Sequence, residues 1–413
     1  MPSNTLLTIG MITQEMLDCF DTNRVFSKRI MNQYSGEFAQ PGAKTGPSIN
    51  IRLPARLSTT SGPSMTPIDY IEESVPLTID QQEKVPLSFT SFEVTLSLDD
   101  WRNRVGNPSS IVLSNKVDLY GLGLYWKCPN AIMSPATGTG KWLAYLNAGA
   151  ILADNGAPND GEWSAVLNQY EQAAVVNENK PLFQDSAQIA QQYKRGMMGM
   201  SGGFSWFWDQ NIAAHTTGAR GGAPTYTSTG AGGTTIVTGA WTAAAAPRLK
   251  KGDIFTIANV YAVNPVSLAS TGQLRQFTVT ADVSSDASGN ATIPIYPAII
   301  GPGSPRQTVT VLPTASAPLG FSLGGTAYTA NTVYMQNLCF QREFAAMAMC
   351  RLQDPFSGEA SYSVDSTSGV AIRTWRSSDI TTDAHLSRAD IAFGYAITRP
   401  EWGCRIWSVP PTL

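Results

Sequence analysis

One short glycine-rich stretch of the chain has residue types that could hold a phosphate group. Gly138-Thr-Gly-Lys141 matches the end of a nucleotide-binding P-loop, in which backbone N–H groups and a lysine contact the phosphates. That motif also needs a glycine where this chain has Pro135, and a serine or threonine where it has Trp142. The stretch therefore does not predict nucleotide binding. Gly121-Leu-Gly123 is no better, because it lacks the third glycine of a dinucleotide fingerprint.

Two histidines are the residues of this chain that could serve as the base of a serine- or cysteine-type hydrolase site. His215 is expected in a polar loop, and His385 in a turn that follows Asp383. Neither adjoins a nucleophile motif, so we expect solvated or interface histidines. The paired carboxylates Glu72-Glu73 and Asp99-Asp100 would point to opposite faces of a strand, which makes them poor acid–base dyads. No catalytic site is predicted.

The cysteines are scattered without the spacing of metal ligands, and their number is odd. They are Cys19, Cys128, Cys339, Cys350 and Cys404. Free thiols in a reducing compartment are the prediction. Neither a metal nor another cofactor is expected.

The composition of the chain limits its partners. Only 14% of the 413 residues are charged, against about 25% in ordinary soluble proteins. The net charge of −3 gives no electrostatic attraction to nucleic acid. The first residues lack a basic stretch followed by an apolar run, and no run of ~18 apolar residues occurs. Neither a signal peptide nor a membrane span is therefore expected.

The N-terminal half is expected to combine helices with extended runs. Thr13 can cap a helix that runs to about Tyr34, and a polar linker, 35–47, follows it. The apolar side of this helix comprises Met16, Leu17, Phe20, Phe26 and Ile30. Extended runs are predicted at 48–57 and 84–98, separated by a polar excursion at 58–83 that is long for one compact domain.

A second long helix is predicted where a capping asparagine precedes a proline, at Asn107-Pro108, and it extends to about Lys127. Gly121 and Gly123 weaken it, so close packing must hold it or require them. Further helices are predicted at 141–154, around 171 and at 186–195, and strands at 163–167 and 203–209.

The segment from about 225 to 335 has the pattern of a separate small β barrel. Its entry, Ala213–Ala246, is rich in Gly, Ala and Thr and holds a single charge, Arg220. From Lys250 onward strands alternate with turns, and no helical pattern interrupts them. The predicted core comprises Ile254, Thr256, Val260, Phe277, Val279, Ala281, Val283, Ile293, Ile295, Val309 and Val311.

The C-terminal quarter contains two β-favouring runs, Val370–Arg376 and Ile391–Ile397, and Pro400 ends the second. Four of its segments carry a resemblance. They are Asn337-Leu-Cys-Phe-Gln-Arg342, Asp379-Ile380, Arg388-Ala-Asp-Ile-Ala-Phe-Gly394 and Arg399-Pro-Glu-Trp-Gly-Cys-Arg405. This pattern resembles the major capsid proteins of tailed bacteriophages, and within them the coat proteins of short-tailed phages that carry an inserted β domain. Lys250–Ile257 and Leu274–Ala281 are similar to that inserted domain.

The resemblance implies an α+β fold, the tailed-phage major capsid fold, with an inserted all-β barrel domain. The implied parts are an N-terminal arm (1–47), an extended β loop (48–98), a spine helix with the peripheral domain (99–135), an axial domain (136–224), the inserted barrel (225–335) and the C-terminal part of the axial and peripheral domains (336–413). The arm packs on other subunits in that family, and the loop reaches across a neighbour. The residues alone leave two alternatives open, a core helix of the same chain and a long surface hairpin.

The function implied is self-assembly into the icosahedral head that encloses phage DNA, without enzymatic activity. The partners implied are copies of the same chain in hexamers and pentamers, a scaffolding protein and a portal protein, with double-stranded DNA enclosed without sequence-specific binding and no membrane. The chain would assemble in the host bacterial cytoplasm and end in the virion. The residues assigned to subunit contacts are Leu17, Phe20, Arg56, Ile68, Tyr70 and Gly232.

Two other classes of protein remain open at this point. One is a β-rich decoration or tail protein of a virion, and the long helices predicted at 13–34 and 107–127 argue against it. The other is a hydrolase with an appended β binding module, and the missing catalytic motif argues against that. Images of the purified protein would separate these classes from a shell-forming subunit.

Overall fold

The computed structural model describes residues 9–34, 46, 48–54, 56, 72–90, 105–136, 140–179, 199–228, 232–353, 355, 358–365, 369–379 and 384–410. The chain divides into two compact units. The first unit comprises Met1–Arg52, Ser74–Gly121 and Ala345–Thr398, and the second comprises Leu53–Glu73, Leu122–Phe344 and Arg399–Leu413. No helix of the described residues is long and apolar enough to cross a membrane.

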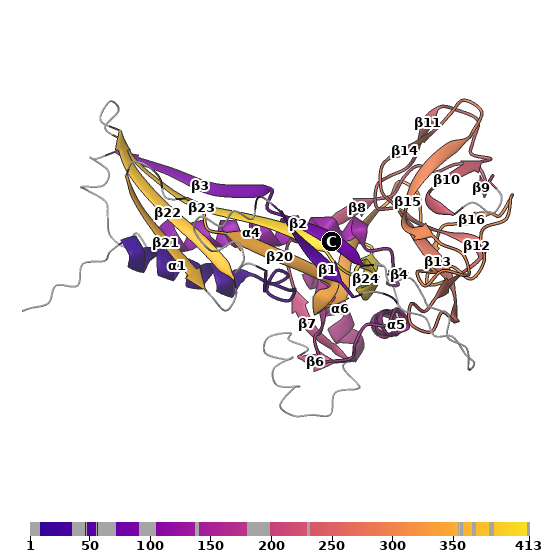
Figure 1. The fold of residues 1–413 in the computed structure, drawn as a ribbon, viewed down its shortest axis with the longest axis horizontal. Helices are drawn as coiled ribbons and strands as arrows, with labels where there is room; N and C mark the ends of the chain where they lie inside the picture. The colour runs from indigo at the N-terminus through magenta and orange to yellow at the C-terminus, as the bar shows by residue number, and fades with distance from the viewer. Residues whose placement is uncertain are drawn as a thin grey trace, which may run out of the picture. The chain divides into compact units, whose positions relative to one another are not determined.

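The first unit is built on a five-stranded antiparallel sheet in which β23 (Ala384–Ile397) is the longest strand. β23 pairs with β22 (Val370–Asp379), with β20 (Ala345–Cys350) and with β3 (Gln81–Thr90), while β21 (Glu359–Asp365) continues the sheet from β22 (Figure 1). The two strands predicted in the C-terminal quarter are confirmed. His385, predicted in a turn, lies in β23 instead, because the strand begins seven residues earlier than its apolar run.

Helix α1 (Ile9–Asn23) packs on β21 and β22 (Figure 1). The predicted bounds were wrong at both ends: the helix begins at Ile9, so Thr13 lies inside it and does not cap it, and it ends at Asn23 and not near Tyr34. Asp118 explains the end, since its carboxylate accepts hydrogen bonds from the backbone N–H groups of Val25 at 2.6 Å and Ser27 at 2.9 Å. A continuing helix would use both donors for its own carbonyl groups.

Asp118 belongs to α4 (Asn107–Gly123), the second long helix that the sequence predicts. Its last predicted residues tighten into a 3₁₀ turn, Leu124–Lys127. The expectation that a glycine allows close packing is confirmed for Gly121, where a Cβ would lie 2.8 Å from the Phe26 ring and 2.9 Å from Tyr395. Gly123 has open space at the same position.

The region of the predicted excursion contains more strand than expected. β1 (Ser48–Leu53) pairs with β2 (Glu73–Thr78), and β3 follows after a turn of two residues. Residues 73–78 and 81–83 are therefore in strands, and the prediction that a polar connection runs to residue 83 is wrong. The alternation of Val75, Leu77 and Ile79 carries this signal, and Leu77 is fully buried. Residues 57–71 lie outside the described part of the chain.

The second unit contains a seven-stranded mixed sheet around β19 (Val333–Gln341). β19 pairs with β24 (Gly403–Ser408), β5 (Trp163–Leu167) and β8 (Ala214–Thr216). The sheet is completed by β4 (Ala131–Met133), β7 (Phe204–Trp208) and β6 (Met200–Ser201).

Two helices accompany this sheet, α5 (Lys141–Asp154) and α6 (Gln169–Asn179). α5 and β5 have the predicted bounds, and α6 confirms the helix expected around Glu171. The helix expected at 186–195 lies outside the described residues. A shared core joins α5 to the sheet through residues that include Tyr145, Ala148, Leu152, Phe204, Cys339 and Ile406.

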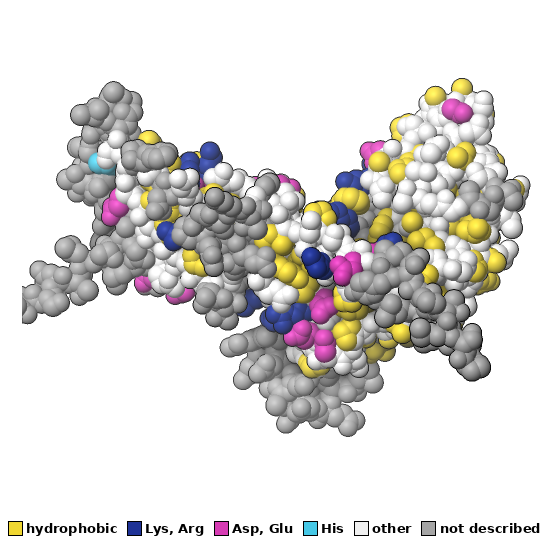
Figure 2. All heavy atoms as spheres, in the orientation of Figure 1, with side chains coloured by type: hydrophobic (Ala, Val, Ile, Leu, Met, Phe, Trp, Pro, Cys, Tyr) yellow, Lys and Arg dark blue, Asp and Glu magenta, His cyan; other side chains and the backbone are white. Residues whose placement is uncertain are grey.

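The second unit contains another sheet, formed by strands that lie between β8 and β19 in the sequence. This six-stranded sheet has the order β16 (Leu319–Gly320), β12 (Ile254–Val263), β13 (Ser270–Val279), β15 (Ala291–Ile299), β10 (Gly233–Gly239) and β9 (Thr225–Tyr226). Two short pairs accompany it, β11 (Ala246–Leu249) with β14 (Val283–Ser285) and β17 (Ser322–Leu323) with β18 (Thr326–Ala327). Figure 2 shows mostly uncharged atoms on this part of the surface.

These strands have their own core, and most residues predicted for it are buried there. Phe255, Phe277 and Ile293 have no exposed surface. Ile254 is buried in a different cluster, with Tyr334 and Trp407. Two other predicted members are wrong. Ala281 is exposed because β13 ends at Val279 and the chain turns before β14, and Val311 is 52% exposed because the segment after Val309 leaves the sheet.

Candidate contact residues and buried polar sites

The six residues assigned to subunit contacts fall into different environments. Leu17 and Phe20 are buried inside the first unit of their own chain, with 1% and 0% of their surface exposed. Arg56, in the second unit, forms an ion pair with Glu401 at 2.8 Å, and Gly232 is exposed. Ile68 and Tyr70 lie outside the described residues. A contact to another subunit stays a prediction for all six.

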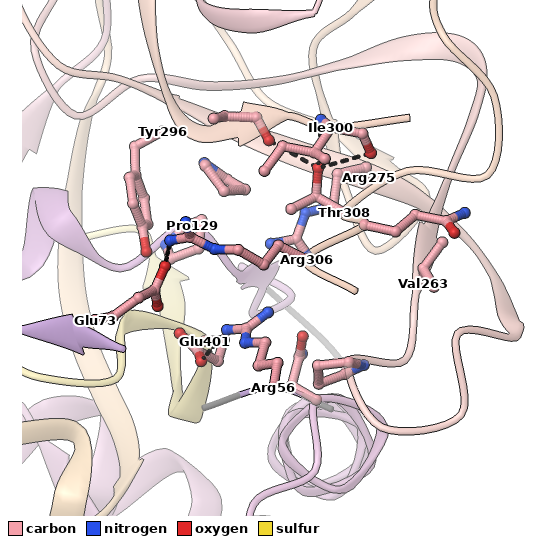
Figure 3. A pocket seen from close by; sticks show the side chains of 15 residues that line it. Arg56, Glu73, Pro129, Val263, Arg275, Tyr296, Ile300, Arg306, Thr308 and Glu401 are labelled. Atoms are coloured by element: carbon pink, nitrogen blue, oxygen red, sulfur yellow. Dashed lines mark hydrogen bonds and ion pairs between the residues drawn. The ribbon is translucent and has the colours of Figure 1, made fainter. Parts of the chain in front are cut away.

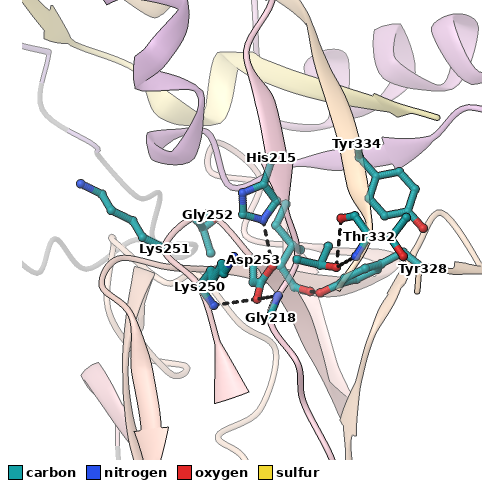
Figure 4. Close-up of polar contacts among 12 residues, drawn as sticks. His215, Gly218, Lys250, Lys251, Gly252, Asp253, Tyr328, Thr332 and Tyr334 are labelled. Carbon is teal, nitrogen blue, oxygen red and sulfur yellow. Dashed lines mark hydrogen bonds and ion pairs between the residues drawn. The ribbon is translucent and has the colours of Figure 1, made fainter. Parts of the chain in front are cut away.

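His215 is not a solvated loop residue, because it lies in β8 with 3% of its surface exposed. Figure 4 shows its ring directed at Asp253, and the Nε2–Oδ1 distance is 2.8 Å. Its Nδ1 lies 3.1 Å from the hydroxyl of Tyr125. The sequence did not predict this position. The segment Ala214–Thr216 is followed by threonine and glycine, and it is a strand because it pairs with β19.

Asp253 has no exposed surface, and its carboxylate is shared among three donors. Besides His215, it accepts the backbone N–H groups of Gly218 at 3.0 Å and Lys250 at 2.9 Å (Figure 4). The histidine–aspartate pair resembles half of a hydrolase triad. Its third neighbour is the Tyr125 hydroxyl and the pair is buried, so the arrangement fixes the turn before β12 against β8.

Arg405 is a second buried polar group of the same unit, with no exposed surface. Its guanidinium donates to the carbonyl oxygen of Gly252 at 2.9 Å and to the hydroxyl of Thr278 at 3.1 Å. Burial lowers the pKa of this arginine, although the neighbouring acidic and phenolic groups oppose the shift. The side chain therefore joins β24 to the turn before β12 and to β13. The sequence placed Arg405 in a family pattern without predicting this contact.

The remaining candidates for chemistry do not form a site within the described residues. His385 is exposed, and its Nδ1 lies 3.1 Å from the hydroxyl of Ser378 on the neighbouring strand. No group of three His, Cys, Asp or Glu residues in the described part of the chain could hold a metal ion. All five cysteines are free thiols, as predicted. Burial raises the pKa of Cys128 to about 12 and also raises that of Cys404, which keeps both thiols protonated.

A cavity of about 170 Å³ in the second unit was not anticipated from the sequence. Three arginines and two glutamates line it together with Tyr296, and Figure 3 shows how they converge. The charged residues are Arg56, Arg275, Arg306, Glu73 and Glu401. They come from five segments far apart in the chain, so spacing in the sequence carries no signal for the cavity.

Within the described residues the protein is mixed α+β, with about 21% helix and 45% strand. Residues 1–407 match the family model described as P22 coat protein, gene protein 5, and the chain belongs to that family. It is a major capsid protein of a tailed bacteriophage and forms the icosahedral shell of the virion. The expected α+β capsid fold and the shell function are thereby confirmed.

Solved structures similar to this chain include capsids of other phages. The capsid of Ralstonia phage GP4 is 8% identical, with coverage of 100% of this chain and 96% of that chain and a TM-score of 0.47. The Mycobacterium phage Che8 structure is 11% identical, with coverage of 93% and 90% and a TM-score of 0.45. No curated protein matches the chain.

Proposed function

We propose that this coat protein forms hexamers and pentamers that close into a shell around double-stranded DNA, with a scaffolding protein and a portal protein as partners. Membership in the coat protein family carries the proposal. The net charge of −3 supports enclosure of DNA without sequence-specific binding, because a strongly basic inner surface would hold the phosphate backbone. Assembly takes place in the cytoplasm of the host bacterium, and the subunit has no enzymatic activity of its own.

The test is expression of the full chain with and without its scaffolding protein, followed by electron microscopy of the purified product. We expect closed particles with scaffolding protein present, and fewer or irregular particles without it. A subunit that stays monomeric under both conditions would contradict the proposal. Regular shells of equal yield in both samples would leave the shell function intact and remove the scaffolding protein as a required partner.

Assignment of the parts follows the family: an arm at 1–47, an extended loop at 48–98, a spine helix at 99–135, axial segments at 136–224 and 336–413, and an inserted barrel at 225–335. The self-contained core around Phe255 and Phe277 supports the barrel as a folding unit. β19, which starts at Val333, pairs with strands of the seven-stranded sheet, so the excised fragment should end at Thr332.

The fragment Thr225–Thr332 tests the barrel assignment. A cooperative thermal melt and dispersed amide shifts would support an independent fold, whereas a random-coil spectrum would make the segment an extension of the axial domain. Tyr328 and Trp407, whose ring centroids lie 4.9 Å apart, pack against each other in the intact chain. We therefore expect the fragment to melt below the temperature at which the same strands unfold in the full chain.

Subunit contacts through the extended loop are tested by a shortened chain. Since residues 73–83 already belong to strands, the deletion is confined to 58–71 and replaced with a short Gly-Ser linker. We expect a folded, soluble subunit that no longer closes shells. A loss of stability in the free subunit as large as that of a core truncation, ~2–5 kcal/mol, would place the loop in a core instead.

A further inference from the structure

Arg275 stands out among the residues that line the cavity. It lies on β13, only 7% of its surface is exposed, and its Nε atom is buried without a hydrogen-bond partner. No described residue forms an ion pair or a hydrogen bond with its guanidinium. A buried arginine normally has its donors paired, because an isolated buried charge costs several kcal/mol.

The other two arginines of the cavity already have partners (Figure 3). Arg306 forms an ion pair with Glu73. Arg56 lies 2.8 Å from Glu401, and Arg399 also lies within 4.0 Å of the same carboxylate. The two glutamates therefore balance two of the three arginines that line the cavity, which leaves one positive charge at Arg275.

Another buried arginine, Arg248 on β11, shows the contacts of an arginine with a purely structural role. Arg248 is buried to a similar extent, with 6% of its surface exposed. Its guanidinium donates to the hydroxyl of Ser285 and to three backbone carbonyl groups, at 2.6–3.1 Å. Arg275 has none of these contacts, although it occupies an equally buried position. Its donors face a cavity and not a set of carbonyl groups.

The cavity has the size and the polarity for a small anion. One water molecule needs about 10–15 Å³ of such space, so about 170 Å³ accommodates a group of several non-hydrogen atoms. Burial raises the pKa of Tyr296, which keeps its hydroxyl protonated and able to donate. An arginine fork binds carboxylate or phosphate oxygens with two parallel hydrogen bonds.

We propose that the cavity between β13, β15 and the segments at Arg56, Glu73 and Glu401 is an oxyanion site. In this site the guanidinium of Arg275 binds one phosphate or carboxylate group, and Arg56 and Arg306 line the same cavity. Two sources have this chemistry: free inorganic phosphate, and an acidic side chain on a second copy of this net-negative chain. Residues of a single subunit line the cavity, and only the second of these sources rests on the proposed assembly of copies into a shell.

The experiment uses the full-length subunit and inorganic phosphate, with sodium chloride at equal ionic strength as the reference. The variants are Arg275→Met and Arg275→Lys, and the control is Arg342→Met. Arg342 is an exposed arginine whose partner is Glu162, at 2.9 Å. Phosphate also stabilises proteins generally through exclusion from their surface, so the difference between the variant and the control isolates the site.

Three results are expected. Without phosphate, Arg275→Met melts at or above the wild-type temperature, because it removes an unpaired buried charge. With rising phosphate, the melting temperature of wild type and Arg342→Met increases by more than that of Arg275→Met. Arg275→Lys binds phosphate roughly tenfold or more weakly than wild type, because a single ammonium group replaces the two-pronged fork.

The proposal fails if Arg275→Met gains as much from phosphate as the control does. It also fails if the same variant loses stability equally at every phosphate concentration, since that result assigns Arg275 a packing role. Assembly assays identify the source of the anion. Shell formation that phosphate inhibits in wild type, and that Arg275→Met impairs even without phosphate, supports an acidic side chain of a second copy. Shells that still gain thermal stability from phosphate through Arg275 support the free anion.

Discussion

Truncation of Phe20 tests whether helix α1 serves its own subunit or a neighbour. The side chain has no exposed surface and lies on the helix face that packs against β21 and β22. Leu17 and Met16 are buried beside it, with 1% and 2% of their surface exposed. Phe20→Ala removes the ring from this core without changing the exposed face of the helix.

The magnitude follows from complete burial. Truncation of a buried phenylalanine to alanine costs about 3–5 kcal/mol, because transfer free energy is lost and a cavity remains. Leu17→Ala should cost about 2–5 kcal/mol for the same reason. The two residues share one core, so the double variant should lose less than the sum of the two. Whole domains are stable by only about 5–15 kcal/mol, so either change should be plain in the free subunit.

Urea unfolding of the unassembled subunit measures these losses, and Asp18→Ala is the matched control. Asp18 lies on the exposed side of the same helix, and its removal should change stability by no more than about 0.5 kcal/mol. Shell formation is then followed by electron microscopy. If Phe20→Ala unfolds like the control and yet forms no shells, the helix acts on another subunit and its packing in the single chain does not explain its role.

Three further predictions concern close packing, titration and thiol reactivity. Gly394→Ala should cost about 1–3 kcal/mol, because its Cβ would lie 1.9 Å from the carbonyl oxygen of Thr78. At Gly123 a Cβ would have nothing within 4 Å, so Gly123→Ala should leave the stability unchanged or raise it by up to about 1 kcal/mol. Equal losses of stability for the two variants in urea unfolding would refute the packing argument. Burial raises the pKa of Asp118 above its ordinary 3.8, so its contribution to stability is full below that pH and is lost as the pH rises through the folded-state pKa. The advantage of wild type over Asp118→Asn in urea should therefore shrink as the pH rises from about 4, and an advantage that grows would be inconsistent with this sign. Three buried thiols should resist iodoacetamide at pH 8 until the chain unfolds, and rapid alkylation of the native subunit would contradict their burial. They belong to Cys128, Cys339 and Cys404.

Local patterns predicted those elements whose limits are determined by nearby residues. The bounds of α5 and β5 agree with the prediction because each has an uninterrupted pattern of its own. The end of α1 could not be predicted, because Asp118, 93 residues beyond Val25, binds the N–H groups that a longer helix needs. The same limit applies to β8, which is a strand only because β19 pairs with it.

The candidate sites were predictable to a smaller extent than the fold. The sequence alone was enough to reject nucleotide-binding and hydrolase motifs, because such motifs are defined by residue types and their spacing. His215 and Asp253 are 38 residues apart, so their hydrogen bond depends on tertiary structure. The cavity around Arg275 was even less predictable, because its net charge depends on which arginine forms an ion pair with which glutamate. That pairing is a property of distances in space and not of order along the chain.

The segments by which the chain resembles capsid proteins contain residues that hold the fold together. Asn337 has no exposed surface, accepts the N–H of Asn168 at 2.8 Å and donates to the hydroxyl of Ser408 at 2.9 Å. Asp390 is equally buried and forms ion pairs with two arginines of the first unit's sheet. Each of these positions needs one particular side chain, because a buried polar group without its partner costs about 1–3 kcal/mol. A pattern without catalytic chemistry can therefore still be specific, since it records which polar contacts this fold must bury.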